Sequence, residues 1–317
     1  MEIPTVDLSP FLKSSGDGAA AKNNAITTIR QACEEYGFFQ IANHGVPLHL
    51  ISRALQLSGE FLAFPDDQKL QYAAPSEAPL PAGYRQHPPE SADKLEYFLM
   101  FDPKSGFNVM PPNPPDFREV LEEMFGHFRK TGELMEQILN DCFELPPDFL
   151  KTFNGDRSWD FMVALRYFPI SSESDGKNGL LEHEDSNIFT FVIQDDVGGL
   201  EVKKAGEWIP VVPNPDTIVV NIGDVLQVLS NKKFKSATHR VARPKGRDRH
   251  SFAFFYNIEG EKWIEPLAKF TEDVGEAAKY KRFQYKEYQA MRMKNKTNPP
   301  ERPEDEVRIT YYELPAR

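Results

Sequence analysis

The sequence predicts an α+β protein with a helical N-terminal half, a β-rich centre and one further helix near the C-terminus. Apolar residues recur with helical spacing in the first half, whereas short strand-like runs separated by turn residues dominate from about residue 160. Several strands at such close spacing are typical of a β-sandwich or barrel. The 317 residues suffice for one large domain or two ordinary ones.

Residues 1–155 are expected to form a mostly helical N-terminal region that packs on the core. Short strands are expected at 3–8 and 38–41, the second followed by a turn-rich loop. Three segments have helical spacing of apolar residues: 19–36, 48–72 with an interruption at Pro65, and 117–143. Prolines and glycines dominate 74–115, which predicts loops with short strands.

Residues 156–270 are expected to form the β core. The predicted strands are 162–168, 188–194, 200–203, 208–212, 217–221, 225–229, 239–242 and 251–256. Beyond Pro266, residues 273–294 are one more helix candidate, followed by a tail rich in proline and glutamate. We therefore expect residues 271–317 to form a C-terminal helix and tail laid back on the core.

Composition limits the classes of partner. The chain has 37 Lys and Arg against 48 Asp and Glu, a net charge of −11 without a dense basic block, which argues against nucleic-acid binding. No apolar run approaches the roughly 20 residues that cross a bilayer, and the first residues lack the pattern of a secretory signal. Cys33 and Cys142 suit a reducing compartment. We expect a monomer in the cytoplasm, with the nucleus as a second location, that acts on a small molecule.

The strongest chemical signal is the tripeptide His183-Glu184-Asp185 together with His239. If 183–185 is a strand, His183 and Asp185 share one face and Glu184 points the other way. Two imidazoles and one carboxylate are the ligand set of non-haem Fe(II) oxygenases, which leaves positions open for cosubstrate and dioxygen. The tripeptide alone is a weak motif, because a lone histidine is more often a surface or core residue.

A second group lies ten residues after His239. Arg249 and Ser251 share one face of the last predicted core strand, and a guanidinium beside a hydroxyl suits the binding of a carboxylate. The structural alternative is a salt bridge to an internal Asp or Glu, since a buried Arg needs a partner. A metal site nearby favours a dicarboxylic cosubstrate.

Five further stretches of the core carry a recognisable pattern: QDDVGGLEV (194–202), WIPV (208–211), VVNIGD (219–224), SN (230–231) and FKSATHRV (234–241). They resemble the 2-oxoglutarate- and Fe(II)-dependent dioxygenases, and most closely the plant branch with flavonol synthase, anthocyanidin synthase and the gibberellin oxidases. Residues 3–8 and 37–47 look like the N-terminal region of the same branch. The resemblance covers nearly the whole chain and is weakest over 74–155.

The resemblance implies a double-stranded β-helix (a cupin-like jelly roll) with flanking helices. His183, Asp185 and His239 match the iron ligands, and Arg249 with Ser251 matches the pair that binds the far carboxylate of 2-oxoglutarate. The implied cofactors are Fe(II), 2-oxoglutarate and dioxygen, with ascorbate in support. The implied reaction oxidises a C–H bond of a small plant metabolite or hormone by hydroxylation, desaturation or demethylation, with release of succinate and carbon dioxide.

The chain departs from the family pattern at two positions. Glu184 stands where this branch has a small polar residue, and it adds a negative charge near the site. The family often has a tyrosine before a proline, whose hydroxyl touches the cosubstrate, whereas this chain has Phe168 there. Tyr167, one residue earlier, is the candidate replacement, and it would need a shift of register to take that role.

Three alternatives stay open. An oxidase of the same fold that does not use 2-oxoglutarate, as in the ethylene-forming or isopenicillin-type relatives, differs in releasing no succinate. A non-catalytic small-molecule sensor has no need of a complete triad, and a zinc hydrolase fits the three ligands but not the surrounding motifs. Substrate selection is expected in the least familiar segments, around Tyr84, His87, Phe107, Phe255 and 257–270, with ordinary packing as the alternative for each.

Overall fold

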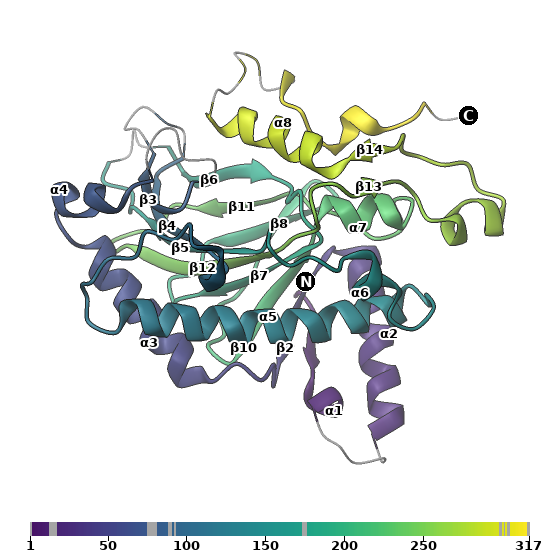
Figure 1. Ribbon diagram of the computed structural model, residues 1–317, viewed down its shortest axis with the longest axis horizontal. Coiled ribbons are helices and arrows are strands. Elements are labelled where there is room, and N and C mark those ends of the chain that lie inside the picture. The colour runs from purple at the N-terminus through teal and green to yellow at the C-terminus, as the bar shows by residue number, and fades with distance from the viewer. Residues whose placement is uncertain are drawn as a thin grey trace.

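Two β-sheets form the centre of the computed structural model (Figure 1). The model describes residues 2–12, 18–74, 81–87, 91, 93–172, 176–297, 300, 302 and 305–315. The larger sheet has eight strands in the order β1-β2-β10-β7-β12-β5-β4-β3, and the smaller has four in the order β6-β11-β8-β9. Together with the flanking helices they give the α+β jelly roll that the sequence predicts.

Both halves of the chain build the larger sheet. Its middle strands come from the central region: β5 (Phe161–Tyr167), β7 (Phe189–Gln194), β10 (Thr217–Ile222) and β12 (Arg249–Tyr256). Its edges come from the N-terminal region: β1 (Thr5–Asp7), β2 (Phe38–Ala42), β3 (Gly83–Gln86) and β4 (Leu95–Phe101). Residues before 155 therefore supply sheet edges as well as helices, and the division at residue 155 stays a prediction.

The smaller sheet is formed by the central region alone. Its strands are β6 (Asn178–His183), β8 (Leu200–Lys204), β9 (Glu207–Pro210) and β11 (His239–Ala242). All of its pairings are antiparallel, and β6 lies beside β11 in a register that places His183 opposite His239. This pairing puts two candidate ligands side by side.

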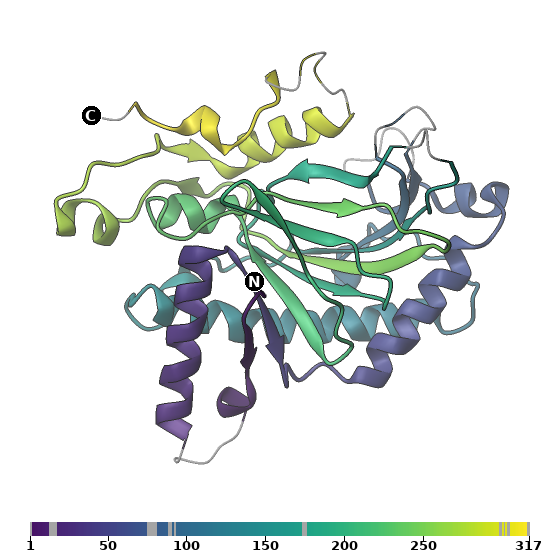
Figure 2. The same cartoon turned by 180° about the vertical axis from the view of Figure 1, so that it is seen from behind.

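Helices cover the larger sheet on its outer side. Three long helices contact its strands: α2 (Ala19–Glu35), α3 (Leu48–Leu62) and α5 (Phe117–Cys142). The fourth long helix, α8 (Tyr285–Thr297), lies on the other side of the sheets from α5. Figure 1 shows α5 running past the sheet, and Figure 2 shows α2 beside the N-terminal strand β1. Shorter helices and strands are α1 (Ser9–Leu12), α4 (Asp66–Lys69), α6 (Phe149–Phe153), α7 (Asp224–Leu229), β13 (Trp263–Ile264) and β14 (Phe283–Gln284).

Aromatic side chains hold α5 against the sheet. Phe125 and Phe128 on α5 contact Phe254 on β12, with ring centroids 5.1 and 5.4 Å apart. All three are fully buried, and such burial contributes about 1.5–3 kcal/mol for each ring. Because Phe254 faces the helix, the alternation of the strand turns Arg249, Ser251 and Phe255 toward the interior of the jelly roll.

Most predicted elements agree with the structure, and the expected break at Pro65 falls between α3 and α4. The strand predicted at 225–229 is wrong, since these residues form the helix α7 (Asp224–Leu229). A short, fully apolar run fits a buried helix as well as a buried strand, so periodicity does not separate them. The last helix begins at Tyr285 rather than at 273.

The tripeptide at 183–185 is also not a strand throughout. β6 ends at His183, and Glu184 and Asp185 lie in the loop that follows. Strand alternation therefore does not bring Asp185 to the histidines. The loop between β6 and β7 does so instead.

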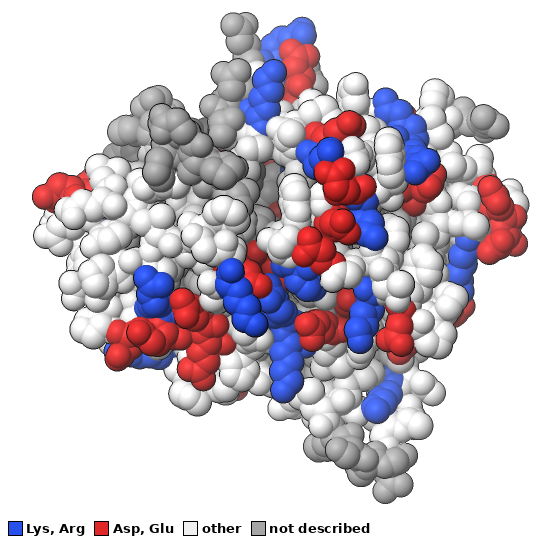
Figure 3. Space-filling model, viewed as in Figure 1, with Lys and Arg blue, Asp and Glu red and all other residues white. Residues whose placement is uncertain are grey.

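The surface charges and the two cysteines agree with what the composition predicts. On the face shown in Figure 3, basic and acidic side chains alternate without a broad patch of one sign. Cys33 and Cys142 are both free and buried. In the described part of the chain, no helix combines the length and apolar character needed to cross a membrane.

Candidate active site

The two histidines of the site enter from neighbouring strands of the smaller sheet. His183 closes β6 and His239 opens β11, and their ring centroids lie 4.3 Å apart. The Nδ1 atom of His183 is 2.8 Å from the carbonyl of Leu181, and that of His239 is 3.0 Å from the carbonyl of Ala237. A carbonyl can only accept a hydrogen bond, so each Nδ1 is a protonated nitrogen, and each Nε2 is the nitrogen that faces Asp185.

Asp185 completes the triad and divides its two oxygens between different tasks. Oδ1 lies 3.7 Å from Nε2 of His183 and 3.9 Å from Nε2 of His239. Oδ2 accepts hydrogen bonds from the Thr190 hydroxyl at 2.6 Å and the Asn221 amide at 2.7 Å. Both partners stand on the larger sheet and are fully buried, so the carboxylate is oriented from one sheet toward the histidines of the other.

The charge state of Asp185 suits metal binding. Burial by itself raises the pKa of this carboxyl, but His239, His183 and the hydrogen bonds from Thr190 and Asn221 outweigh burial and lower the pKa to about 2. The group is therefore a carboxylate at neutral pH. One ligand atom from each of His183, Asp185 and His239 lies within 4.8 Å of the other two, and the described residues contain no other group of this kind.

The donor set fits Fe(II). Two imidazoles and one carboxylate on one side of a common point are the facial set of non-haem iron oxygenases. The hydrogen bonds of both Nδ1 atoms and of Oδ2 supply the outer contacts that orient such ligands.

Glu184 points away from the triad. Its carboxylate accepts a hydrogen bond from the Thr238 hydroxyl and forms an ion pair with Arg308, 3.2 Å away. The residue therefore faces the C-terminal tail rather than the metal position.

Arg249 is the second feature of the interior and is only 1% exposed. Its guanidinium donates to the Ser251 hydroxyl at 3.1 Å and to the Gln194 side-chain oxygen at 3.0 Å. Its Nε atom has no hydrogen-bond partner, and no carboxylate of the described residues lies within 4.0 Å of the guanidinium. The salt bridge weighed as an alternative is thus not formed. Burial lowers the pKa of Arg249, against the raising effect of Tyr167 and Asp195.

Tyr167 joins this group without any shift of register. It lies directly opposite Arg249 in the β5–β12 pairing, and the guanidinium sits 4.8 Å from the centre of its ring. Phe168 follows the end of β5 and packs against Arg166 instead. Burial raises the pKa of Tyr167, so its hydroxyl keeps its proton at neutral pH.

Sequence reasoning missed the residues that orient the ligands. Thr190, Asn221 and Gln194 reach the site from β7 and β10 of the larger sheet. Gln194 and Asn221 lie within the stretches that resemble the family, but nothing in their spacing assigns them a partner. Only the pairing of the strands could have found them.

The residues that were expected to contact the substrate differ in where they lie relative to the site. Tyr84 is fully buried on the helix side of the sheet, where its hydroxyl donates to Glu96. Tyr84 is therefore a packing residue rather than a substrate contact. Phe255 stacks on Phe161, with ring centroids 4.4 Å apart, on the same side of β12 as Arg249. His87 lies beside Tyr97, and Phe107 is half exposed.

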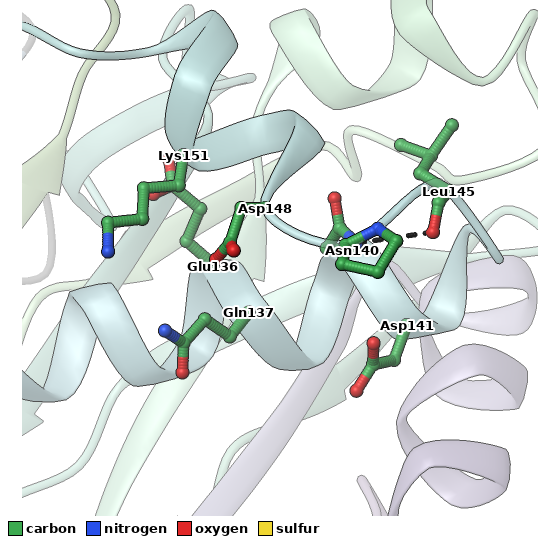
Figure 4. A pocket seen from close by; sticks show the side chains of 8 residues that line it. Glu136, Gln137, Asn140, Asp141, Leu145, Asp148 and Lys151 are labelled. Carbon is green, nitrogen blue, oxygen red and sulfur yellow. Dashed lines mark hydrogen bonds between the residues drawn. The ribbon is translucent and has the colours of Figure 1, made fainter.

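A surface pocket at the end of α5 is separate from the triad (Figure 4). Asn140 lies at its wall and joins the neighbouring loop to the helices by donating to the carbonyl of Pro146 at 3.0 Å and accepting from the amide of Leu150 at 3.0 Å. The pocket is lined by Glu136, Gln137, Asn140, Asp141, Leu145, Pro147, Asp148 and Lys151. Its polar groups serve the junction of α5 and α6.

Comparison with known proteins places the chain in a family. Residues 159–258 match the model of the 2OG-Fe(II) oxygenase superfamily, and residues 3–127 match the N-terminal model named for a non-haem dioxygenase in morphine synthesis. A 1-aminocyclopropane-1-carboxylate oxidase of Musa acuminata is 33% identical over 306 residues, covering 95% of this chain and 97% of the relative. A flavonol synthase/flavanone 3-hydroxylase of Arabidopsis thaliana is 32% identical, covering 90% and 84%.

Solved structures agree with this assignment. The crystal structure of JOX2 in complex with 2OG, Fe and JA has a TM-score of 0.79 and 28% identity, covering 92% of this chain and 84% of that one. The dioxygenase for auxin oxidation from rice has a TM-score of 0.77 and 25% identity, covering 99% and 100%. The chain belongs to the plant-type 2-oxoglutarate- and Fe(II)-dependent oxygenases. It is a dioxygenase, and His183, Asp185 and His239 form its metal-binding triad.

Proposed function

We propose that Arg249, Ser251 and Tyr167 bind the far carboxylate of 2-oxoglutarate in this enzyme. The observation that carries the proposal is the buried Arg249 guanidinium, which has polar neighbours but no carboxylate among the described residues. A buried charge without a counter-charge is costly. A dicarboxylic cosubstrate supplies that charge, and a guanidinium offers two parallel hydrogen bonds to it.

The chain's own side chains prepare the site before any ligand arrives. Hydrogen bonds at Nδ1 orient the rings of His183 and His239 so that both Nε2 atoms face Asp185, and Thr190 with Asn221 fixes the Asp185 carboxylate. Iron with 2-oxoglutarate and dioxygen supplies oxidation of a C–H bond with release of succinate and carbon dioxide. The apolar side chains around Phe255 and Phe161 exclude water from this interior and orient the substrate.

The substrate we propose is a small, specialised plant metabolite or hormone. The support comes from relatives whose names or solved complexes refer to flavonols, 1-aminocyclopropane-1-carboxylate, JA and auxin. Because these molecules differ in size and charge, we propose the substrate class and not a single compound. The reaction we propose is the oxidation of one C–H bond by hydroxylation, desaturation or demethylation.

The experiment is a succinate assay over a panel of phenylpropanoids, alkaloids, terpenoids and hormones. Product and succinate are expected in equal amounts, whereas product without succinate would establish the alternative of an oxidase that does not use 2-oxoglutarate. Arg249→Gln is expected to weaken 2-oxoglutarate binding roughly 100-fold, because removing one partner of a buried charge pair costs about 2–5 kcal/mol. Arg247→Gln is the matched control, since Arg247 is an exposed arginine paired with Asp196.

We further propose a cytoplasmic monomer, with the nucleus as a second location. The support is the pair of free, buried thiols, which suits a reducing compartment. Light scattering of the purified chain would measure its mass in solution, and a dimer would contradict the monomer.

A further inference from the structure

We infer that Glu184 is a positioning residue for the metal site. Its carboxylate lies outside the triad, joins the two histidine-bearing segments, and fastens the C-terminal segment to them. The C-terminal segment is defined here as α8 (Tyr285–Thr297) and residues 305–315.

The first link joins the two histidine segments. Glu184 lies between the ligands His183 and Asp185, and its side chain accepts a hydrogen bond from the hydroxyl of Thr238. Thr238 directly precedes the third ligand, His239. One side-chain contact therefore connects the loop after β6 to the start of β11 on the side away from the metal.

The second link comes from two arginines of the C-terminal segment. Arg308 forms an ion pair with the Glu184 carboxylate at 3.2 Å, and Arg292 donates to the Glu184 carbonyl at 2.6 Å. The side chains of Glu184 and Arg308 are 14% and 29% exposed, and Arg292 is 9% exposed. The pair is thus shielded enough to be worth more than an ion pair at the open surface.

The same loop meets the C-terminal segment at the next two residues. Ser186 donates to Gln289 on α8 at 3.2 Å. The carbonyl of Asp185 accepts from the amide of Asp224 at 2.8 Å, and the Asp224 carboxylate accepts from Tyr288 on α8 at 2.6 Å. Residues 184–186 are therefore each tied to α8 or the tail, directly or through one residue, and α8 lies along β6 and β11 in Figure 1.

The loop needs such support because β6 ends at His183. Beyond that point no strand ladder fixes the backbone that carries Asp185, and a ligand that is not held gains conformational freedom that metal binding must remove. Contacts outside the ligands usually change metal affinity by about 10–100-fold when they are lost. Glu184 supplies the central contact of this group.

The test uses the full-length, metal-free chain and Co(II) as the probe, followed by absorbance. Glu184→Ala and Arg308→Gln are each expected to weaken Co(II) binding about 10-fold or more and to change the ligand-field spectrum of the bound ion. The double variant is expected to bind about as weakly as the weaker single variant, because both changes break the same pair. Arg308→Lys keeps the charge and is expected to restore much of the affinity.

The matched control is Glu182→Gln. Glu182 lies one residue before His183 and pairs with Lys203 at 3.2 Å, but this pair is exposed and does not reach the C-terminal segment. Its Co(II) affinity and spectrum are expected to equal those of the wild type. Thermal unfolding of each metal-free variant separates a folding defect from a metal defect, and Arg308→Gln tests the inference if Glu184→Ala does not fold.

Two results would overturn the inference. One is wild-type Co(II) affinity and spectrum in both single variants. The other is an equal loss of Co(II) affinity in Glu182→Gln, which would show that any negative charge near β6 supports metal binding and that the position of Glu184 has no special role. A wild-type chain that binds no divalent metal would instead contradict the metal site itself.

Discussion

At the scale of single residues, the site depends on how Asp185 divides its oxygens. Oδ1 faces the histidines, while Oδ2 is held by Thr190 and Asn221. A carboxylate held at one oxygen is already oriented when the metal arrives, so less freedom is lost on binding. The residues that hold it are as much part of the site as the ligands.

Thr190→Val tests whether the hydrogen bond to Oδ2 of Asp185 supports metal binding. The change keeps the β-branched shape but removes the hydroxyl that donates to Asp185, so metal affinity is expected to fall about 10-fold while the fold is kept. Titration of the metal-free chain with Co(II) measures the effect. Thr217→Val is the control, since the hydroxyl of Thr217 binds Gln40 and Asn214 instead. Equal affinities in all three proteins would show that Asp185 needs no such support.

At the scale of elements, the short helix α7 (Asp224–Leu229) fixes the loop that carries Asp185. Its first amides donate to the carbonyls of Asp185 and Asn187, at 2.8 and 3.1 Å. The amides at a helix start have no partner within the helix, and here the metal loop satisfies them. Residues 224–229 therefore serve the site as a helix, because the helix start supplies these two donors.

Asp224 gives α7 a pH-dependent stability. Burial, opposed by Arg292, Tyr288 and Ser236, raises the pKa of this carboxyl to about 6. Because the pKa is higher in the folded state, folding favours the protonated carboxyl. The stability that Asp224 contributes is therefore complete below the unfolded pKa of about 3.9. This stability is lost as the pH rises through the folded pKa of about 6.

The measurement is the free energy of unfolding of the metal-free protein between about pH 4 and about pH 7. The wild type is expected to lose roughly 3 kcal/mol over this range relative to Asp224→Asn, from about two pKa units at 1.36 kcal/mol each. Asp216→Asn, at an exposed position, is expected to follow the wild type. Parallel curves for wild type and Asp224→Asn would place the pKa of Asp224 near its ordinary value.

At the scale of the whole molecule, the site joins parts that are far apart in the sequence. His183 and His239 belong to the smaller sheet, the residues that orient Asp185 belong to the larger sheet, and the C-terminal segment contacts the loop between them. A metal bound here links both sheets. Metal binding therefore stabilises the fold as well as preparing the reaction.

Metal is accordingly expected to raise the unfolding temperature. A divalent ion at 100 times its dissociation constant adds about 2.7 kcal/mol, which is a shift of several degrees for a chain of this size. Differential scanning calorimetry with and without Co(II) measures it. The shift is expected to vanish in Asp185→Ala and at acid pH, because only neutral imidazoles bind the metal. A shift that persists in Asp185→Ala would place the stabilising ion elsewhere.

The sequence by itself determined the class of fold, most of the elements and the identity of the ligands. Periodic apolar residues depend on local geometry alone, and the spaced motifs around His183, Asp185, His239 and Arg249 carry the resemblance to the family. Only the tertiary structure decided how Asp185 reaches the histidines, that Tyr167 lies opposite Arg249, and that Glu184 faces Arg308. These contacts join residues up to 124 positions apart, and no local pattern encodes such pairs, because strand register and packing arise only when the whole chain folds.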